Sequence, residues 1–357
     1  MANIFDYLND VAYDSFYDLP VNELDVLALT ELTYLAFDNV VSQEPKRLID
    51  LAPQIPRDTT MLTNKNRLQL LDQLAQHKRF KNCKLSDFIN DIDPELQKQF
   101  AAMTYRISLD TYLLVFRGTD DSIIGWKEDF HMTYMREIPA QKHALQYLEN
   151  FFAQHPNQKV ILAGHSKGGN LAVYAASQLD PLLQKNIVAV YTFDAPGLHK
   201  ELTETAGYQN MMERTKVFVP QGSIIGMMLE IPDKKIVVRS TALGGLAQHD
   251  TFSWQVEDKH FVQLDETNSD SQQVDTTFKE WVETVPDTEL QLYFDLFFGI
   301  ILDAGISSIN DLSSFKVIEH IHHLFVQAQS LTPEERETMG RLTQLLIDTR
   351  YQAWKNR

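Results

Sequence analysis

One serine, Ser166, has neighbours that suit a catalytic nucleophile. It lies in the sequence GHSKG, residues 164–168, directly after the apolar, mostly β-branched run 160–162 and before small and apolar residues with helical spacing. This pattern predicts a strand, a sharp turn and a helix, with Ser166 at the turn. A helix that begins there directs free backbone N–H groups toward whatever the serine attacks. We therefore interpret Ser166 as a nucleophile; the alternative is a glycine-rich turn that binds phosphate or only packs tightly.

A second loop follows an earlier pair of strands. Residues 101–116 contain two β-rich runs joined by Leu109 and Asp110, which predicts a hairpin, and the second run leads into the polar loop 117–121. An oxyanion is commonly held by the N–H after the nucleophile and by an N–H from a loop after an earlier strand. Those donors would be the backbone N–H groups of Lys167 and Thr119. Without Ser166, the loop would be interpreted as a plain turn.

Two segments resemble class 3 triglyceride lipases. VFRGTDDSIIGWKEDF, residues 115–130, is similar to their FRG[ST]…W…D segment, and AGHSKGGNLA, residues 163–172, is similar to their GHSLGGALA turn. The lysine after the serine and the helical N-terminal region resemble a group of bacterial relatives in the same superfamily. The resemblance covers about residues 101–254. It implies an α/β-hydrolase fold, hydrolysis of carboxylic esters, Ser166 as nucleophile and Thr119 as oxyanion residue. Hydrolysis through an acyl-enzyme would need no metal or organic cofactor.

A serine hydroxyl needs a general base, and His249 is the histidine we predict for that role. It stands in the glycine-containing loop 243–254, after the last predicted strand, where the resembling family also places its histidine. His199 and His260 remain alternatives. Three further histidines lie in a helical C-terminal tail and are expected to be surface or packing residues: His320, His322 and His323.

The acid of the triad is where the sequence departs from the lipase pattern. Class 3 lipases carry an aspartate after the strand that corresponds to 216–219, and Ser223 stands at that position here. Asp194 ends the preceding predicted strand, so we predict Asp194 as the acid that orients the histidine. The alternatives are Asp250, Asp233, or a Ser–His dyad that Ser223 or water orients. An aspartate that only caps the turn after its strand would look the same in sequence.

Two apolar stretches lie near the predicted site. Residues 123–138 correspond to the lid of the resembling family and contain Trp126, which would contact an acyl substrate or pack in a helix. Residues 223–231 contain Ile224 and Met227, which would line an acyl pocket or belong to the core.

The elements that must position these residues alternate between strands and helices. A helix over 140–152 and strands over 187–193, 216–219 and 236–238 predict a doubly wound, mostly parallel sheet with its site at the carboxyl ends of the strands. Flanking regions are predicted to be helical, at 22–38, 65–78 and from Ser86, and at 278–285, 288–304, 311–329 and from 332. We expect a helical N-terminal cover at 1–100, an α/β-hydrolase core at 101–270 and a helical C-terminal extension at 271–357. No residue types of a catalytic site are recognised in the N-terminal cover.

Composition restricts the class of partner. A formal net charge of −17 argues against nucleic acid or an anionic membrane as a partner. Cys83 is the only cysteine, which excludes an intramolecular disulfide, and the first residues lack a signal-peptide pattern, so a cytoplasmic protein is expected. The apolar run 290–306 carries two aspartates and is too short to span a bilayer, so it predicts a buried helix rather than membrane insertion.

The sequence therefore predicts a serine esterase or lipase that acts on an acyl ester or lipid through an acyl-enzyme intermediate. A thioesterase, phospholipase or acyltransferase would use the same residues. A protein that binds a lipid or a protein partner without turnover is the alternative from another class, favoured by the absence of an aspartate after 216–219. The sequence does not indicate an oligomeric state.

Overall fold

The computed structural model describes residues 2–59, 64–120, 123–232, 234–306 and 327–355. The strands are β1 (Lys46–Arg47), β2 (Lys84–Asp93), β3 (Lys98–Arg106), β4 (Thr111–Phe116), β5 (Lys159–His165), β6 (Ile187–Phe193), β7 (Thr215–Pro220), β8 (Lys235–Val238), β9 (Val256–Glu257), β10 (His260–Phe261) and β11 (Gln263–Leu264). The α-helices are α1 (Ile4–Asp10), α2 (Glu23–Leu32), α3 (Leu48–Leu51), α4 (Asn64–Gln76), α5 (Ile123–His131), α6 (Pro139–Gln154), α7 (Lys167–Gln178), α8 (Pro181–Gln184), α9 (Lys200–Thr203), α10 (Ala206–Met212), α11 (Gly245–Gln248), α12 (Ser269–Thr284), α13 (Asp287–Asp303) and α16 (Pro333–Lys355). Three short 3₁₀ helices, η1 (Ala52–Gln54), η2 (Ile225–Met227) and η3 (Thr251–Ser253), complete the described elements.

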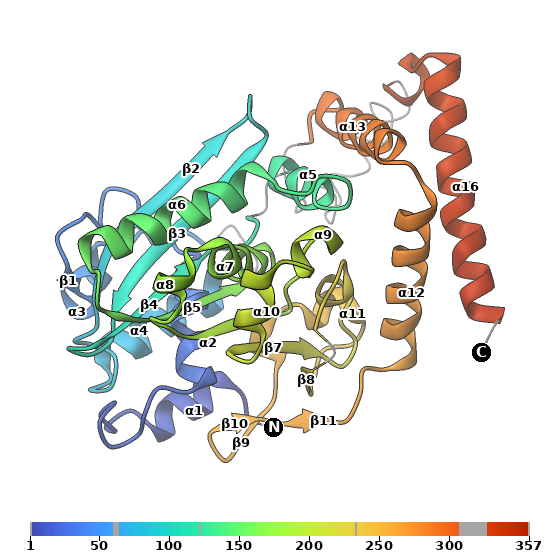
Figure 1. Cartoon of the computed structure of the whole chain (residues 1–357). Helices are drawn as coiled ribbons and strands as arrows, with labels where there is room; N and C mark the ends of the chain where they lie inside the picture. The colour runs from blue at the N-terminus through green and yellow to red at the C-terminus, as the bar shows by residue number, and fades with distance from the viewer. Residues whose placement is uncertain (1, 60–63, 121–122, 233, 307–326, 356–357) are drawn as a thin grey trace.

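A nine-stranded sheet runs through the described part of the chain in the order β1-β2-β3-β4-β5-β6-β7-β8-β11. Neighbouring strands from β4 to β8 are parallel, whereas β1 to β4 and the β8–β11 pair are antiparallel. Helices connect the parallel strands, as in a doubly wound fold, and the α/β-hydrolase class predicted from the sequence is confirmed (Figure 1).

Both faces of the sheet are apolar and covered by helices. Along β4, Leu113 and Val115 join the core that contains α1, α2 and α4, while Tyr112, Leu114 and Phe116 join the core that contains α6 and α7. This alternation follows from the two-residue period of a strand. The N-terminal helices thus form one layer of the fold, and α2 is buried along its whole length.

The helix predicted from Ser86 is wrong. Residues 84–93 form β2, which pairs with β3 in antiparallel register from Lys84↔Arg106 to Asp93↔Lys98. A serine followed by mixed polar and apolar residues resembles a capped helix, but the long pairing with β3 decides the conformation here. The sheet therefore begins within the region predicted as helical cover, whereas the helices predicted over 22–38 and 65–78 occur as the shorter α2 and α4.

The C-terminal helices pack on α5 at one end of the molecule. Trp281 of α12 and Phe294 and Phe298 of α13 form an apolar cluster with Ile123 of α5, and Trp126 packs against it. Figure 1 shows α12 and α16 side by side beyond the sheet. Most of the helix predicted over 311–329 lies outside the described residues. Within the described ranges, no helix is both long and apolar enough to cross a bilayer.

Candidate active site

Ser166 occupies a strained turn between β5 and α7. Its backbone has φ 57° and ψ −137°, a conformation that costs a non-glycine residue about 1–3 kcal/mol. The strand and helix approach closely here, because a Cβ on Gly164 would lie 2.0 Å from the carbonyl carbon of Gly168. The small residues around Ser166 are therefore required by the backbone itself, and the strand, turn and helix predicted from the sequence are present.

His249 and Asp194 form a hydrogen-bonded pair beside this turn. The Nδ1 atom of His249 lies 2.6 Å from Oδ2 of Asp194, whose side chain is completely buried at the end of β6. The other carboxylate oxygen, Oδ1, accepts hydrogen bonds from the Ser223 hydroxyl and from the Gly226 N–H. Three donors therefore hold the carboxylate, and Nε2 of His249 is left as the nitrogen that could accept a proton.

Ser223, which takes the position of the aspartate in the lipase pattern, contacts the predicted acid. It follows β7, the strand that pairs with β6, and its hydroxyl donates to Oδ1 of Asp194.

The alternative acids and bases have other partners. His199 caps α9, and His260 lies 2.7 Å from Glu23. Asp250 caps η3 through the N–H of Phe252. Asp233, His320, His322 and His323 lie outside the described residues.

The loop after β4 abuts the nucleophile turn. A Cβ on Gly118 would lie 2.9 Å from Cβ of Ser166, so the next residue, Thr119, is held close to the serine. The Thr119 hydroxyl donates to Oδ2 of Asp129 on α5 at 2.6 Å. This contact fixes the Thr119 side chain, and the N–H of Lys167 stands at the start of α7, directly after Ser166. The oxyanion roles of Thr119 and Lys167 remain predictions.

The side chain of Lys167 carries a buried charge that sequence analysis did not predict. Its Nζ lies 2.8 Å from Oε2 of Glu128 and donates to the carbonyl and side-chain oxygens of Gln99, each at 3.1 Å. The side chains of Lys167 and Glu128 are both inaccessible to solvent. Helix α5 is thereby joined to the residue that follows the nucleophile.

Replacing Lys167 by methionine is expected to lower the free energy of unfolding by about 3–5 kcal/mol, because the Glu128 carboxylate would stay buried without its cation. Urea unfolding followed by circular dichroism measures this loss. The double variant Lys167→Met/Glu128→Gln should recover part of it. A single variant within about 1 kcal/mol of wild type would contradict this assignment.

The carboxyl group of Asp129 has a raised pKa. Burial raises its pKa from 3.8 to about 6, although Lys167 and the Thr119 hydroxyl both favour the charged form. Because the folded pKa lies above the unfolded value, the ionised form destabilises the fold, and this cost grows as the pH rises from 4 to 7.

Asp129→Asn is therefore expected to gain stability relative to wild type as the pH rises. The difference in unfolding free energy between the two proteins should shift by about 1 kcal/mol in favour of the variant between pH 5 and pH 7.5. Urea unfolding at several pH values measures the shift. A difference that stays constant over this range would contradict the raised pKa.

Sequence analysis missed contributions from the N-terminal helices. The hydroxyl of Tyr34, just after α2, accepts a hydrogen bond from the Gly118 N–H at 3.1 Å and lies 3.2 Å from Nδ1 of His165. Glu31 of α2 lies 3.2 Å from the same nitrogen. A glutamate and a tyrosine in a mostly apolar helical stretch give no spacing signal for a site 130 residues away, so only the fold reveals them.

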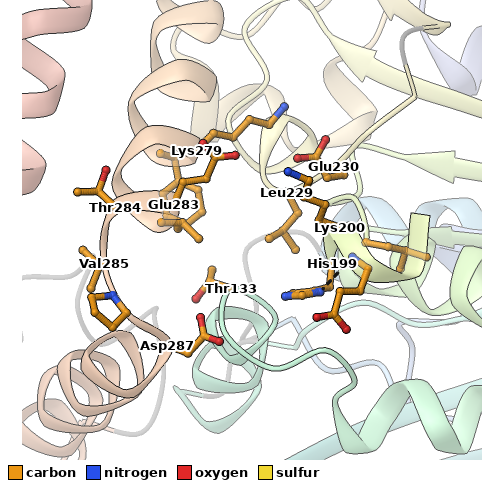
Figure 2. Close-up of a pocket in the computed structure, with 15 residues that line it drawn as sticks. Thr133, His199, Lys200, Leu229, Glu230, Lys279, Glu283, Thr284, Val285 and Asp287 are labelled. Atoms are coloured by element: carbon orange, nitrogen blue, oxygen red, sulfur yellow. Dashed lines mark hydrogen bonds between the residues drawn. The ribbon is translucent and has the colours of Figure 1, made fainter. Parts of the chain in front are cut away.

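The structure places two of the predicted substrate residues in the packing of the fold. Trp126 packs against the C-terminal helices, and Met227 is buried in η2. A cavity of about 590 Å³ instead lies between α12, α9 and Leu229 and Glu230. Figure 2 shows His199 and Leu229 on one side of it, Glu283 and Asp287 on the other, and Thr133 between them. Trp126, Ile224 and Met227 are absent from its lining, and their contact with substrate remains a prediction.

Nothing in the described ranges groups three or more histidine, cysteine, aspartate or glutamate side chains in a way that could hold a metal ion. Ser166, the His249–Asp194 pair and the nearby backbone N–H groups are of the types that acyl transfer through a serine nucleophile uses, and their roles remain predictions.

Several lipase structures resemble the fold. A mono- and diacylglycerol lipase from Aspergillus oryzae is 16% identical, with 69% of this chain and 87% of that chain covered and a TM-score of 0.43. A lipase from Rhizopus microsporus var. chinensis is 15% identical, with 71% and 84% covered and a TM-score of 0.37. The lipase of Rhizomucor miehei, in complex with its propeptide, is 18% identical, with 48% and 59% covered and a TM-score of 0.33. None of the curated proteins matches this chain.

A family profile covers most of the strands and helices of the α/β sheet. The Mbeg1-like profile matches residues 74–299, from the end of α4 into α13, and this range includes Ser166, Asp194 and His249. The lipase-like resemblance predicted from residues 101–254 is confirmed. Because the match extends over more than half of the sequence, this chain belongs to the Mbeg1-like family.

Proposed function

We propose that this chain is a serine hydrolase that cleaves carboxylic esters of acyl groups, as lipases and esterases do. The observation that carries the proposal is the His249–Asp194 hydrogen bond beside the strained turn at Ser166. A nucleophile after β5, an orienting acid after β6 and a base after α11 supply the three roles that acyl transfer requires.

In the proposed reaction, Oγ of Ser166 attacks the ester carbonyl while Nε2 of His249 takes the hydroxyl proton. Asp194 accepts the hydrogen bond from Nδ1 and so fixes the tautomer that leaves Nε2 free to act as base. The backbone N–H groups of Thr119 and Lys167 hold the oxyanion. His249 then returns the proton to the departing alcohol, and water hydrolyses the acyl-enzyme by the same steps in reverse.

The same catalytic residues would serve a thioesterase, phospholipase or acyltransferase, which differ from an esterase in the substrate they take. The large cavity carries no argument on this choice, because neither Ser166 nor His249 nor Asp194 lines it.

The proposal is tested with p-nitrophenyl esters of graded acyl length, from acetyl to palmitoyl, and with an acyl-coenzyme A as the anionic thioester. We expect hydrolysis of the neutral esters with an optimum of chain length and little hydrolysis of the thioester. Faster turnover of the thioester would favour a thioesterase. No hydrolysis of any compound by a folded protein would contradict the proposal and favour a binding protein without turnover.

A further inference from the structure

Three segments of the proposed site meet side chains from outside the family match, which begins at residue 74. These segments are the loop at Gly118, His165 before the nucleophile, and residues 249–251 after α11. Gly118 and His165 contact the hydroxyl of Tyr34, which lies just after α2. Thr251 donates to Glu31 of α2, and His165 also lies near this carboxylate. This inference rests on the proposed function, since it concerns how the same site is held in place.

Tyr34 connects the oxyanion loop to the nucleophile turn. Its hydroxyl accepts the Gly118 N–H at 3.1 Å and lies 3.2 Å from Nδ1 and 3.3 Å from the carbonyl oxygen of His165. The guanidinium of Arg67, on α4, lies 4.0 Å from the centre of the Tyr34 ring. Burial raises the pKa of Tyr34, so the hydroxyl stays neutral and can donate to His165 while it accepts from Gly118.

Glu31 connects α4 to the segment that follows the base. Its Oε2 accepts from Nε of Arg67 at 3.1 Å and from Nη2 at 3.0 Å, and its Oε1 accepts from the Thr251 hydroxyl at 2.9 Å. The side chain is only 3% exposed. A carboxylate is costly to bury, so these hydrogen bonds are needed to keep it in place, and they also fix Thr251 two residues after His249.

His165 connects Tyr34 to the segment that carries the base. Its Nε2 lies 3.0 Å from the backbone carbonyl of His249, and the two imidazole rings are 4.5 Å apart. Burial lowers the pKa of His165 to about 4, so the ring is neutral at pH 7 and carries one proton. Because a carbonyl can only accept, that proton lies on Nε2, and Nδ1 accepts from Tyr34. In this tautomer Nδ1 has no proton to give to Glu31, so Glu31 acts on the base segment through Thr251.

We propose that Tyr34 and Glu31 are positioning residues that hold the oxyanion loop and the base segment in register with Ser166. They touch no reacting atom. They act through Gly118, His165 and Thr251, and a displacement of well under 1 Å in such groups is enough to slow a catalysed step. The N-terminal helices therefore contribute to the site as well as covering the sheet.

Tyr34→Phe provides the sharpest test because it removes one hydroxyl and keeps the ring under Arg67. We expect kcat for a p-nitrophenyl ester to fall about 10-fold or more with KM changed less than about 2-fold. Hydrogen exchange of the Gly118 amide should become faster, since its acceptor is lost. Glu31→Gln should also lower kcat, because the amide cannot accept from Arg67 and Thr251 with the strength of a carboxylate.

Tyr7→Phe is the matched control. Tyr7 is a buried tyrosine of α1, and its hydroxyl donates to Oδ1 of Asp25 at 2.8 Å. This variant should lose stability while kcat and the exchange of Gly118 stay at wild-type values.

The outcomes separate positioning from mere stabilisation. Unchanged exchange at Gly118 in Tyr34→Phe, or faster exchange with unchanged kcat, would overturn the inference. An equal loss of kcat in Tyr7→Phe would also overturn it, because the effect would then follow stability. A wild-type protein that hydrolyses no ester would instead contradict the proposed function, and this inference with it.

Discussion

Ser166→Ala is expected to reduce ester hydrolysis by about 10³-fold or more, to the level that binding and the oxyanion donors alone can supply. The variant removes Oγ, the atom that would form the covalent bond. Alanine is smaller than serine and therefore fits the same turn. The loss should appear in kcat, and the protein should remain folded by circular dichroism. Hydrolysis of the p-nitrophenyl ester of optimal chain length measures it.

Ser177→Ala is the control for this result. Ser177 is a buried serine on the same helix, α7, and its hydroxyl donates to the carbonyl of Tyr174 rather than to any site residue. It should retain wild-type kcat. Wild-type hydrolysis by Ser166→Ala would contradict the proposed role of the turn.

Asp194→Asn is expected to lower kcat by up to about 10⁴-fold with little change in KM. The asparagine amide could present an N–H to Nδ1 of His249, which would favour the tautomer whose Nε2 carries the proton and cannot act as base. Steady-state kinetics on the same ester measure kcat and KM separately.

Ser223→Ala is the informative companion, since Ser223 is one of two donors to Oδ1 of Asp194. The Gly226 N–H would still hold that oxygen, so we expect a loss of about 10-fold, as for one hydrogen bond of about 1–2 kcal/mol. A loss in Ser223→Ala that equals or exceeds the loss in Asp194→Asn would contradict Asp194 as the acid and favour the dyad.

The central fold could be predicted because its signals are local. The run 187–193 is mostly apolar and β-branched and forms β6 with those bounds, and α2 begins directly after Asn22, the first residue of the helix predicted over 22–38. β2 could not be predicted in this way, because its residues form a strand only through pairing with β3. Because β2 depends on this pairing, the sequence placed the start of the core at residue 101, whereas the sheet already includes residues before it.

The residues of the candidate site could be predicted only where neighbouring residues in the sequence form a recognisable pattern. The glycines around Ser166 indicate a close backbone approach, and Asp194 directly follows a strand with a clear apolar pattern. Glu31, Tyr34 and the ion pair of Lys167 with Glu128 leave no such mark, because their partners are brought together by tertiary packing. The catalytic roles of Ser166, His249 and Asp194 remain predictions until they are tested.

The most direct test of the proposed hydrolase is covalent labelling with a fluorophosphonate, which reacts with an activated serine. The wild-type protein is incubated with the probe and digested, and mass spectrometry identifies the modified residue. We predict a single adduct on Ser166, with labelling slowed strongly in Asp194→Asn and absent in Ser166→Ala. No adduct on a folded wild-type protein, or an adduct on a different serine, would contradict the assignment of Ser166 as the nucleophile.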